Sequence, residues 1–284
     1  MVSMGGSMRA HPLPTLVILA AICQLFSGLT TVQAEEGVVN LDQVRLTVLF
    51  DNVEPREEGL TAEWGFSCLV ETGEHRFLFD TGSGDAVREN MRQLGVDPAS
   101  LEAVVISHNH WDHIGGLPSL LEELGDVPVV LPKPPDAKMH AELETWGGEV
   151  RIVKYGFELF PGVHLTDVLP AREPERSLVI VTGEGSLIVA GCSHPGVQEI
   201  LGEARKIADQ KPLLFIGGYH LGSSPDGDVH DVIDAFREHE IAYIVPTHCT
   251  GDRATELFRK AFGDHCLRGG AGLVIKGTEL RNGS

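Results

Sequence analysis

The amino-acid sequence predicts an α/β (α+β) protein, and two observations support this class. Apolar segments of strand length alternate with segments whose apolar residues recur at helical spacing along most of the 284-residue chain. Aliphatic residues dominate the composition and aromatic residues make up only 6%, as in ordinary globular proteins of this class. Together the two patterns favour sheets whose strands are connected by helices.

The expected strands follow alternating or continuous apolar runs in chain order. The first run alternates apolar and polar residues, as a half-buried strand does, and two later runs form a hairpin around Gly183-Glu184-Gly185. We expect strands at 43–51, 66–71, 76–80, 101–107, 127–131, 149–154, 163–168, 177–181, 186–190, 213–217, 241–245 and 272–276.

Helices are expected where apolar residues fall on one face. Within 84–94, Val87, Met91 and Leu94 share such a face. The acidic stretch 222–228 is rich in Gly, Ser and Pro and is expected to be a loop. We expect helices at 84–94, 118–124, 136–146, 197–209, 229–239 and 253–262.

The N-terminal segment is expected to be separate from the folded domain. Arg9 precedes an apolar run from Leu13 to Leu29, and this run is followed by the small-residue pattern of a cleavage site that ends at Ala34. A transmembrane anchor is the alternative, but the run is short and contains polar residues. We therefore expect residues 1–34 to be a cleaved signal peptide and residues 35–284 to form one domain. The mature protein is then exported, periplasmic or secreted, without a stable membrane span.

Charge and cysteine content argue against two classes of protein. The formal net charge is −19 and no Lys/Arg-rich run occurs, so a nucleic-acid partner is not expected, because such binding depends on basic patches. The cysteines that remain after cleavage, Cys68, Cys192, Cys249 and Cys266, are too sparse for a disulfide scaffold and form no Cys-x-x-Cys pattern. Cys192 and Cys249 lie next to candidate ligands and are expected to pack there, and a disulfide is left open.

The strongest chemical signal in the chain is a cluster of ligand-type residues at 108–113. His108, His110, Asp112 and His113 follow directly after an apolar run that has the pattern of a buried strand. A lone histidine at a strand end is usually an ordinary polar residue, but chance and packing rarely supply this spacing. Mixed nitrogen and oxygen ligands suit zinc, iron or manganese, and four of them exceed what one tetrahedral ion needs from one segment. We therefore expect one or two divalent metal ions, with zinc preferred.

Other predicted strands end in the same kinds of side chain. Asp80, His194, His220 and His248 each follow a predicted strand. Ligands at several strand ends on one edge of a sheet can meet in one crevice, although they lie far apart in sequence. We therefore expect these four side chains to converge with the cluster at 108–113.

These motifs resemble those of the metallo-β-lactamase-fold superfamily, and the resemblance spans most of the mature chain. The segment 108–113 fits the His-x-His-x-Asp-His motif of that superfamily, and Asp80 fits its upstream strand-end aspartate. The segments 191–196, 217–221 and 246–249 are similar to one branch, which contains the dihydropterin–ribofuranosylaminobenzene phosphate synthases and many hydrolase-like proteins. The resemblance implies a four-layer αββα sandwich of two mixed sheets.

The resemblance also implies roles for the candidate ligands. Asp80 is expected to orient the ligand loop without touching metal. In many relatives an aspartate bridges both metals from the end of the strand before the last ligand strand, but here that strand ends in Gly218-Tyr219-His220. This departure leaves three roles open for His220: weak metal binding, positioning of a substrate anion, or acid–base catalysis. The implied ligand sets are His108, His110 and His194 for the first metal and Asp112, His113 and His248 for the second.

A site of this kind predicts hydrolysis. A cation with an open position lowers the pKa of its bound water from about 16 towards about 7, which makes hydroxide available to attack a phosphoester, a sulfate ester or a lactone. The same or a second metal steadies the developing oxyanion. Asp112 is expected to orient the nucleophile as well as to bind metal. The expected partner is a small-molecule substrate, and neither its identity nor the oligomeric state follows from one sequence.

There are three alternatives to metal-dependent hydrolysis. A transferase resembling the dihydropterin synthases fits the motif segments, but export does not fit a cytoplasmic pathway. The second is a metal- or ligand-binding protein without turnover. The third, a serine hydrolase built on Ser193 and His194, is disfavoured because the Gly-x-Ser-x-Gly spacing is missing. Trp111 and Tyr219 are candidate substrate contacts, with shielding of the ligand loop and packing as their alternatives.

Overall fold

The strands form two mixed sheets in the computed structural model, which describes residues 37–283. The predicted signal peptide, 1–34, therefore lies outside the described residues. In spatial order the first sheet consists of β13 (Val274–Lys276), β1 (Val44–Asp51), β2 (Phe66–Thr72), β3 (His75–Phe79), β4 (Val104–Val105), β5 (Val129–Leu131) and β6 (Val150–Ile152). Neighbouring strands of this sheet are antiparallel from β13 through β1 and β2 to β3, and parallel from β3 through β4 and β5 to β6.

The second sheet is parallel over its first three strands and antiparallel over the remainder. Three parallel neighbours matter for function because their carboxyl ends share one edge of the sheet. In spatial order the sheet consists of β12 (Tyr243–Thr247), β11 (Pro212–Gly218), β10 (Gly185–Val189), β9 (Leu178–Thr182), β8 (Val163–Leu165) and β7 (Phe157–Phe160).

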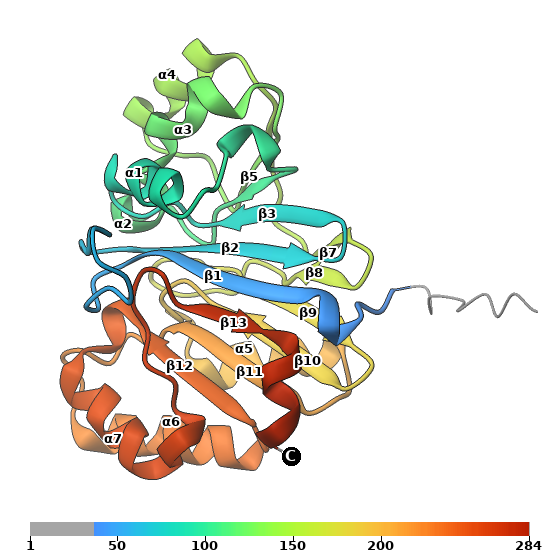
Figure 1. Cartoon of the computed structure of the whole chain (residues 1–284), viewed down its shortest axis with the longest axis vertical. Coiled ribbons are helices and arrows are strands. Elements are labelled where there is room, and N and C mark those ends of the chain that lie inside the picture. The colour runs from blue at the N-terminus through green and yellow to red at the C-terminus, as the bar shows by residue number, and fades with distance from the viewer. Residues whose placement is uncertain (1–36, 284) are drawn as a thin grey trace, which may run out of the picture. The chain divides into compact units, whose positions relative to one another are not determined.

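Helices cover the outer face of each sheet. Figure 1 shows α1 to α4 beside the first sheet and α5 to α7 beside the second, which gives the four-layer αββα arrangement expected from the resemblance. The helices are α1 (Ala86–Gln93), α2 (Trp111–Ile114), α3 (Leu117–Leu124), α4 (Ala137–Trp146), α5 (Val197–Ile207), α6 (Asp226–Glu238) and α7 (Asp252–Phe262).

Alternation along the strands divides the buried side chains between a central core and two outer cores. Phe77 and Phe79 of β3 pack between the sheets, whereas Leu78 packs under the helices of the first sheet. In β10, Leu187 likewise faces the other sheet and Ile188 faces the helices of the second sheet. Because both faces of these strands are covered, they have continuous apolar runs.

Several observed elements differ from the expected ones; β8, for example, ends at Leu165 and not at residue 168. The strand expected at 101–107 is reduced to β4, and beyond its end the backbone N–H of Ser107 donates to Asp80 Oδ1 at 2.7 Å. β7 was not expected; it is a partly exposed edge strand with little alternation. The loop expected at 222–228 is shorter, because α6 already begins at Asp226, where acidic side chains favour a helix N-terminus.

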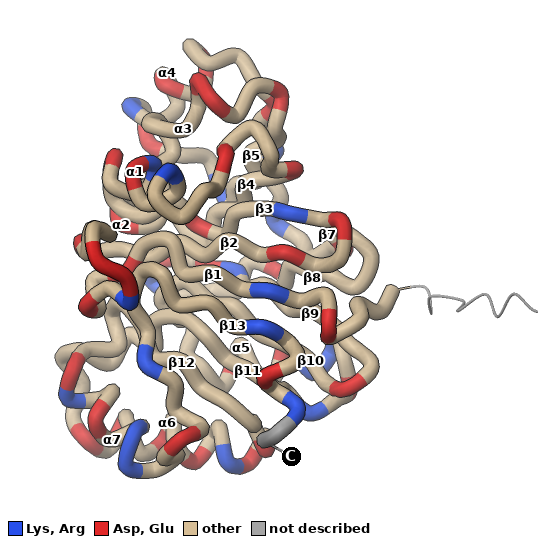
Figure 2. Tube along the Cα trace, viewed as in Figure 1, with Lys and Arg blue, Asp and Glu red and all other residues tan. Residues whose placement is uncertain are grey.

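No helix among the described residues is long and apolar enough to cross a membrane. Figure 2 shows Lys and Arg scattered along the trace among Asp and Glu, and the chain holds 22 basic against 41 acidic residues. That the protein has no nucleic-acid partner stays a prediction from the sequence.

Candidate metal centre

Strand ends from both sheets deliver the candidate site residues to one place. β3 and β4 are parallel neighbours, so Asp80 and His108 leave the first sheet at the same edge. β10, β11 and β12 are also parallel, so His194, His220 and His248 leave the second sheet together. The two edges meet: the ring centroids of His108 and His194, which come from different sheets, are 4.6 Å apart.

The first group of ligand-type side chains, here called the first triad, consists of His108, His110 and His194. Their ligand nitrogens all lie within 4.8 Å of one another. His108 is fully buried whereas His110 is exposed, so the triad opens to solvent on the His110 side. Three imidazoles at this spacing suit a zinc-type ion that keeps an open fourth position.

The second triad consists of Asp112, His113 and His248, all of them buried. His248 Nε2 lies 3.2 Å from Asp112 Oδ2 and 3.3 Å from His113 Nε2. The indole N–H of Trp64 donates to Asp112 Oδ2 at 2.8 Å. The two triads are adjacent, because the ring centroids of His108 and His113 are 4.1 Å apart.

Asp80 orients one histidine of each triad. Its Oδ2 atom accepts hydrogen bonds from His113 Nδ1 at 2.7 Å and from the Ser107 hydroxyl at 2.7 Å. The same hydroxyl lies 2.9 Å from His108 Nδ1 and accepts from it. With both Nδ1 atoms held by oxygen, the Nε2 lone pairs of His108 and His113 face the centre, which is how carboxylates orient metal-binding histidines.

Glu175 supports the first triad, although no sequence motif singled it out. Its buried carboxylate accepts from His194 Nδ1 at 2.8 Å and from the backbone N–H of His194 at 3.0 Å. The other oxygen accepts from the backbone N–H groups of Gly191, Cys192 and Ser193. The carboxylate therefore shapes the whole loop after β10. An acidic residue before a hairpin strand has no motif that distinguishes it from a surface residue.

Asp51 and Asn52 support the second triad and were also missed. Asp51 Oδ1 accepts from the backbone N–H of His248 at 3.0 Å, and Asn52 Oδ1 lies 2.8 Å from His248 Nδ1. Asp51 ends β1. The rule that singled out Asp80, an aspartate at a strand end, would also have found Asp51.

Backbone strain is concentrated at the same strand ends. Asp80, Ser193, His220 and His248 have φ angles between 45° and 60°, a left-handed conformation that is uncommon for residues other than glycine. Among the described residues Glu240 is the remaining non-glycine with positive φ. Such strain persists where the surrounding structure requires a particular side-chain direction, and it is often found at functional sites.

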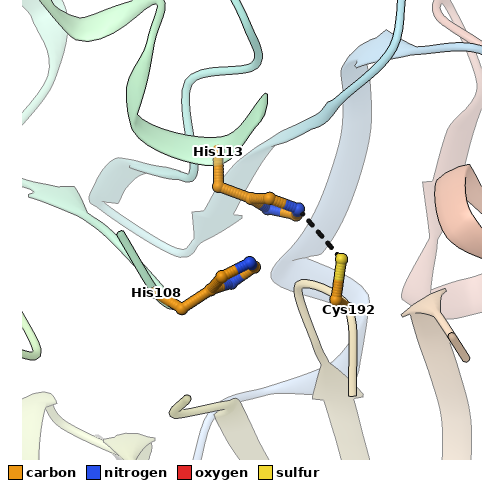
Figure 3. A group of neighbouring side chains, drawn as sticks. All are labelled: His108, His113 and Cys192. Carbon is orange, nitrogen blue, oxygen red and sulfur yellow. Dashed lines mark hydrogen bonds between the residues drawn. The ribbon is translucent and has the colours of Figure 1, made fainter. Parts of the chain in front are cut away.

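Two thiols lie against the triads. Figure 3 shows Cys192 pointing towards His113, with His108 beside them, and Cys192 Sγ lies 3.2 Å from His113 Nε2. Cys249 is buried next to Cys192, and both cysteines are free thiols. The ligand atoms of Cys192, Cys249 and His220 form a further group within 4.8 Å of one another. The two cysteines thus line the site, as expected from their neighbours in sequence.

The pKa values of the ligand histidines are shifted in different directions by their surroundings. Burial and the neighbouring imidazoles lower the pKa of His108. The same two causes lower the pKa of His110, which is less buried. Burial opposes charge on His113 too, but the Asp80 carboxylate raises its pKa above the usual value. Burial likewise opposes ionisation of Asp112, yet its contact with His248 and the charge of His113 hold the pKa of that carboxyl well below its usual range.

These residues fit a divalent metal. His108 Nε2 is buried without a hydrogen-bond partner among the described residues, although buried polar atoms normally have one. Burial raises the pKa of Asp51 and Asp80, so their charged forms need cations nearby. Two dications would balance the formal charge of the four buried carboxylates at the centre, which are Asp51, Asp80, Asp112 and Glu175.

The remaining candidate residues are placed differently from one another. His220 is exposed, and its ring lies 4.6 Å from that of His194. Trp111 is 61% exposed beside the ligand loop, so it is free to contact a substrate. Tyr219 is buried in the core of the second sheet, where its hydroxyl donates to the carbonyl of Phe215 at 3.1 Å. Burial favours the packing alternative for Tyr219, and its contact with a substrate stays a prediction.

Comparison with known proteins now places the chain in a family. A sequence model of the metallo-beta-lactamase superfamily matches residues 64–252, which include both triads. The chain belongs to the metallo-beta-lactamase superfamily. Members of this superfamily typically bind divalent metals, in agreement with the histidine and aspartate groups described above.

Two relatives within the superfamily match this chain over nearly the whole of their own length. The chain is 26% identical to the 7,8-dihydropterin-6-methyl-4-(beta-D-ribofuranosyl)-aminobenzene-5'-phosphate synthase of Methanocaldococcus jannaschii, over 84% of this chain and 99% of that protein. It is 29% identical to Tm1679, a metal-dependent hydrolase of the beta-lactamase superfamily, with a TM-score of 0.71 over 82% of this chain and 98% of that chain. The metallo-beta-lactamase fold protein YhfI of Bacillus subtilis is 16% identical, with a TM-score of 0.59 over 82% and 99% of the two chains, and shows the fold alone.

Proposed function

We propose that this protein is a metal-dependent hydrolase that cleaves a small ester-type substrate: a phosphoester, a sulfate ester or a lactone. The observation that carries the proposal is the pair of adjacent triads, whose ligand atoms lie within 4.8 Å of one another in each triad. Orientation of His108 and His113 from behind, through Asp80, supports a preformed site rather than a chance cluster.

Divalent cations held by the two triads would supply a nucleophilic water near neutral pH and stabilise the oxyanion of the transition state. Asp112 is placed to orient that nucleophile. Trp64 Nε1 and His248 Nε2 both contact Asp112 Oδ2. The other carboxylate oxygen, Oδ1, is therefore the one to accept a proton or a hydrogen bond from the attacking water.

The donor set favours zinc over manganese. The triads supply five imidazoles and one carboxylate, and two thiols lie within reach. Imidazole and thiolate together suit zinc, whereas manganese and magnesium favour sites built mostly from oxygen.

A pocket beside the ligand loop supports a small-molecule substrate. It has a volume of about 270 Å³; Trp111, Ile114 and Met139 supply apolar lining, and Asp136, Lys138 and Glu142 line it as well. Pockets that combine apolar walls with a few polar groups commonly hold small molecules. We infer that this pocket receives an apolar or aromatic group of the ester.

The proposal is tested by hydrolysis assays on protein that has been depleted of metal and reconstituted with zinc, iron or manganese. Substrates are nitrophenyl phosphate mono- and diesters, a nitrophenyl sulfate and a lactone. We expect the protein to hydrolyse at least one of these substrate classes, and only when metal is bound. His110→Ala should lower the rate by at least about 100-fold, because loss of a metal ligand has a larger effect than loss of a residue that supports a ligand.

The control variant is His230→Ala, which removes an exposed histidine on α6. It should retain both metal content and rate. Full activity and full metal content in both His108→Ala and His110→Ala would refute the proposal. Stoichiometric metal without turnover of any substrate would instead favour a protein that binds its ligand without catalysis.

A synthase reaction is the second candidate, because the Methanocaldococcus jannaschii synthase aligns over 99% of its own length. In that reaction a dihydropterin diphosphate and an aminobenzene riboside phosphate are joined, and diphosphate leaves. Incubation of the metal-loaded protein with both compounds, followed by mass spectrometry, would detect the joined product. Formation of that product together with no hydrolysis of the ester panel would favour the synthase.

A further inference from the structure

Two thiols and one imidazole form a compact group beside the two triads. The sulfur atoms of Cys192 and Cys249 and a ring nitrogen of His220 all lie within 4.8 Å of one another. Both cysteines are buried, at 2% and 7% exposure, and neither belongs to a disulfide. None of the three residues belongs to a triad, although Cys192 Sγ also lies within 4.8 Å of ring nitrogens of His108 and His113.

The three residues come from three parallel strands, and the fold makes room for them. Cys192 follows β10, His220 follows β11 and Cys249 follows β12. A Cβ atom added at Gly218, the last residue of β11, would lie 2.5 Å from Cys249 Sγ. The thiol therefore occupies the space that a side chain at position 218 would need.

Ordinary packing does not account for all of these features. A buried cysteine often behaves as a small apolar residue, and that would explain either thiol alone. It would not explain why a left-handed backbone at His220, where φ is 53°, brings a ring nitrogen to within 4.8 Å of both sulfur atoms. Nor does packing require an exposed, polar ring, because His220 contributes little to the buried core.

We propose that Cys192, Cys249 and His220 hold a third cation, a thiophilic divalent ion of the zinc type. Two thiolates and one imidazole are preferred ligands of such an ion, and three protein ligands leave its fourth position open. As the ion binds, each thiol releases its proton to solvent, and the two thiolate charges balance the charge of one dication. Of the three residues, the exposed His220 also lines a surface pocket together with His194.

The third site is connected to the second triad through one sulfur atom. Cys192 Sγ lies 3.2 Å from His113 Nε2, and Figure 3 shows the thiol directed towards that ring. A thiolate has more than one lone pair and can contact two cations at once. Cys192 therefore lies between the second triad and the proposed third site. The chain has no aspartate at the end of β11, where many relatives have one that bridges two metals. This inference goes beyond the proposed function and does not depend on the type of reaction.

The test uses the full protein, reduced and depleted of metal under anaerobic conditions, and titrated with Co²⁺ alone. Thiolate ligands give Co²⁺ an intense near-ultraviolet charge-transfer band that imidazole and carboxylate ligands do not give. We expect this band in the unaltered protein. Cys249→Ser should lose most of the band and bind one cation fewer per chain, as measured by elemental analysis.

The matched control is Cys266→Ser, which removes a partly buried thiol outside the group. It should keep the band and the cation count. Circular dichroism checks folding, and the exposed His220 gives a second variant, His220→Gln, that should also bind one cation fewer if Cys249→Ser does not fold.

Two results would overturn the third site. One is an unaltered protein, with its thiols shown to be reduced, that binds Co²⁺ without the charge-transfer band. The other is an unchanged band and count in both Cys249→Ser and His220→Gln. If hydrolysis persists in either case, only the third site is lost. Absence of any bound metal would remove the proposed hydrolytic function as well.

Discussion

Oε2 of Glu175 lies 2.8 Å from Nδ1 of His194, and the same oxygen accepts the backbone N–H of His194 at 3.0 Å. One buried carboxylate thereby fixes both the ring and the backbone of a candidate ligand. Burial opposes ionisation of Glu175, but these hydrogen bonds lower its pKa, so the carboxylate stays charged. A negative charge behind His194 makes its Nε2 a better metal ligand.

We expect Glu175→Gln to weaken metal binding by roughly 10- to 100-fold, because the amide keeps the shape but loses the charge and one acceptor oxygen. The protein should also lose about 1–3 kcal/mol of unfolding free energy, since buried N–H groups of the loop after β10 lose a good acceptor. Competition with a chelator measures the affinity, and urea denaturation measures the stability.

Glu203→Gln is the matched control for this change. Glu203 lies on α5 and pairs with Lys206 at the surface, away from both triads. Loss of this exposed pair should change stability and metal affinity little. Equal metal affinities in Glu175→Gln and Glu203→Gln would contradict the role given to Glu175.

Acidification should release the cation of the second triad before that of the first. Metal competes with protons for imidazole nitrogen. Because the pKa of His113 is raised above 6.5 by Asp80, protons begin to compete there at higher pH. Because burial lowers the pKa of His108 and His110, these two ligands of the first triad stay neutral to lower pH.

The measurement is the metal content of dialysed protein across a pH series, with Co²⁺ absorption used to distinguish the sites. Asp80→Asn removes the charge that raises the pKa of His113, so proton competition at the second triad should then begin at lower pH. Simultaneous release of both cations from the unaltered protein would count against the assigned difference.

Trp111→Ala should raise KM by roughly 2- to 10-fold with little change in kcat, because loss of an aromatic contact costs about 0.5–1.5 kcal/mol. The side chain is 61% exposed, so stability should change by no more than about 0.5 kcal/mol. Tyr155→Ala, at a position that is 72% exposed and outside this pocket, is the control and should leave KM unchanged. An unchanged KM in Trp111→Ala would mean that Trp111 only shields the ligand loop.

Chelation should lower the thermal stability of the protein. Loss of one cation present at 100 times its Kd removes about 2.7 kcal/mol of stabilisation. For a domain of this size that corresponds to a fall in Tm of roughly 5–10 °C. The buried carboxylates Asp51 and Asp80 explain the direction, because they remain in the interior without a cation. Circular dichroism melts with and without chelator test this, and His110→Ala should show a smaller difference between the two conditions.

The sequence by itself determined the fold class and the local metal motif. His108, His110, Asp112 and His113 lie within six residues, so their spacing is visible without any knowledge of the fold. The strand ends at Asp80, His194, His220 and His248 could also be read, because apolar runs mark strands and the polar residue after each run is conspicuous. Parallel pairing then brings such ends to one edge.

Tertiary structure alone decided which residues stand behind those ligands. Glu175 reaches His194 across 19 positions, and Asp51 reaches His248 across 197, and neither contact has a local pattern. The direction of Tyr219 was decided in the same way, since period-two alternation places it in the core only once the register of β11 is known. Hydrophobic periodicity is a property of neighbours in sequence, whereas support of a buried ligand depends on how two sheets pack, and that is fixed only when the whole core forms.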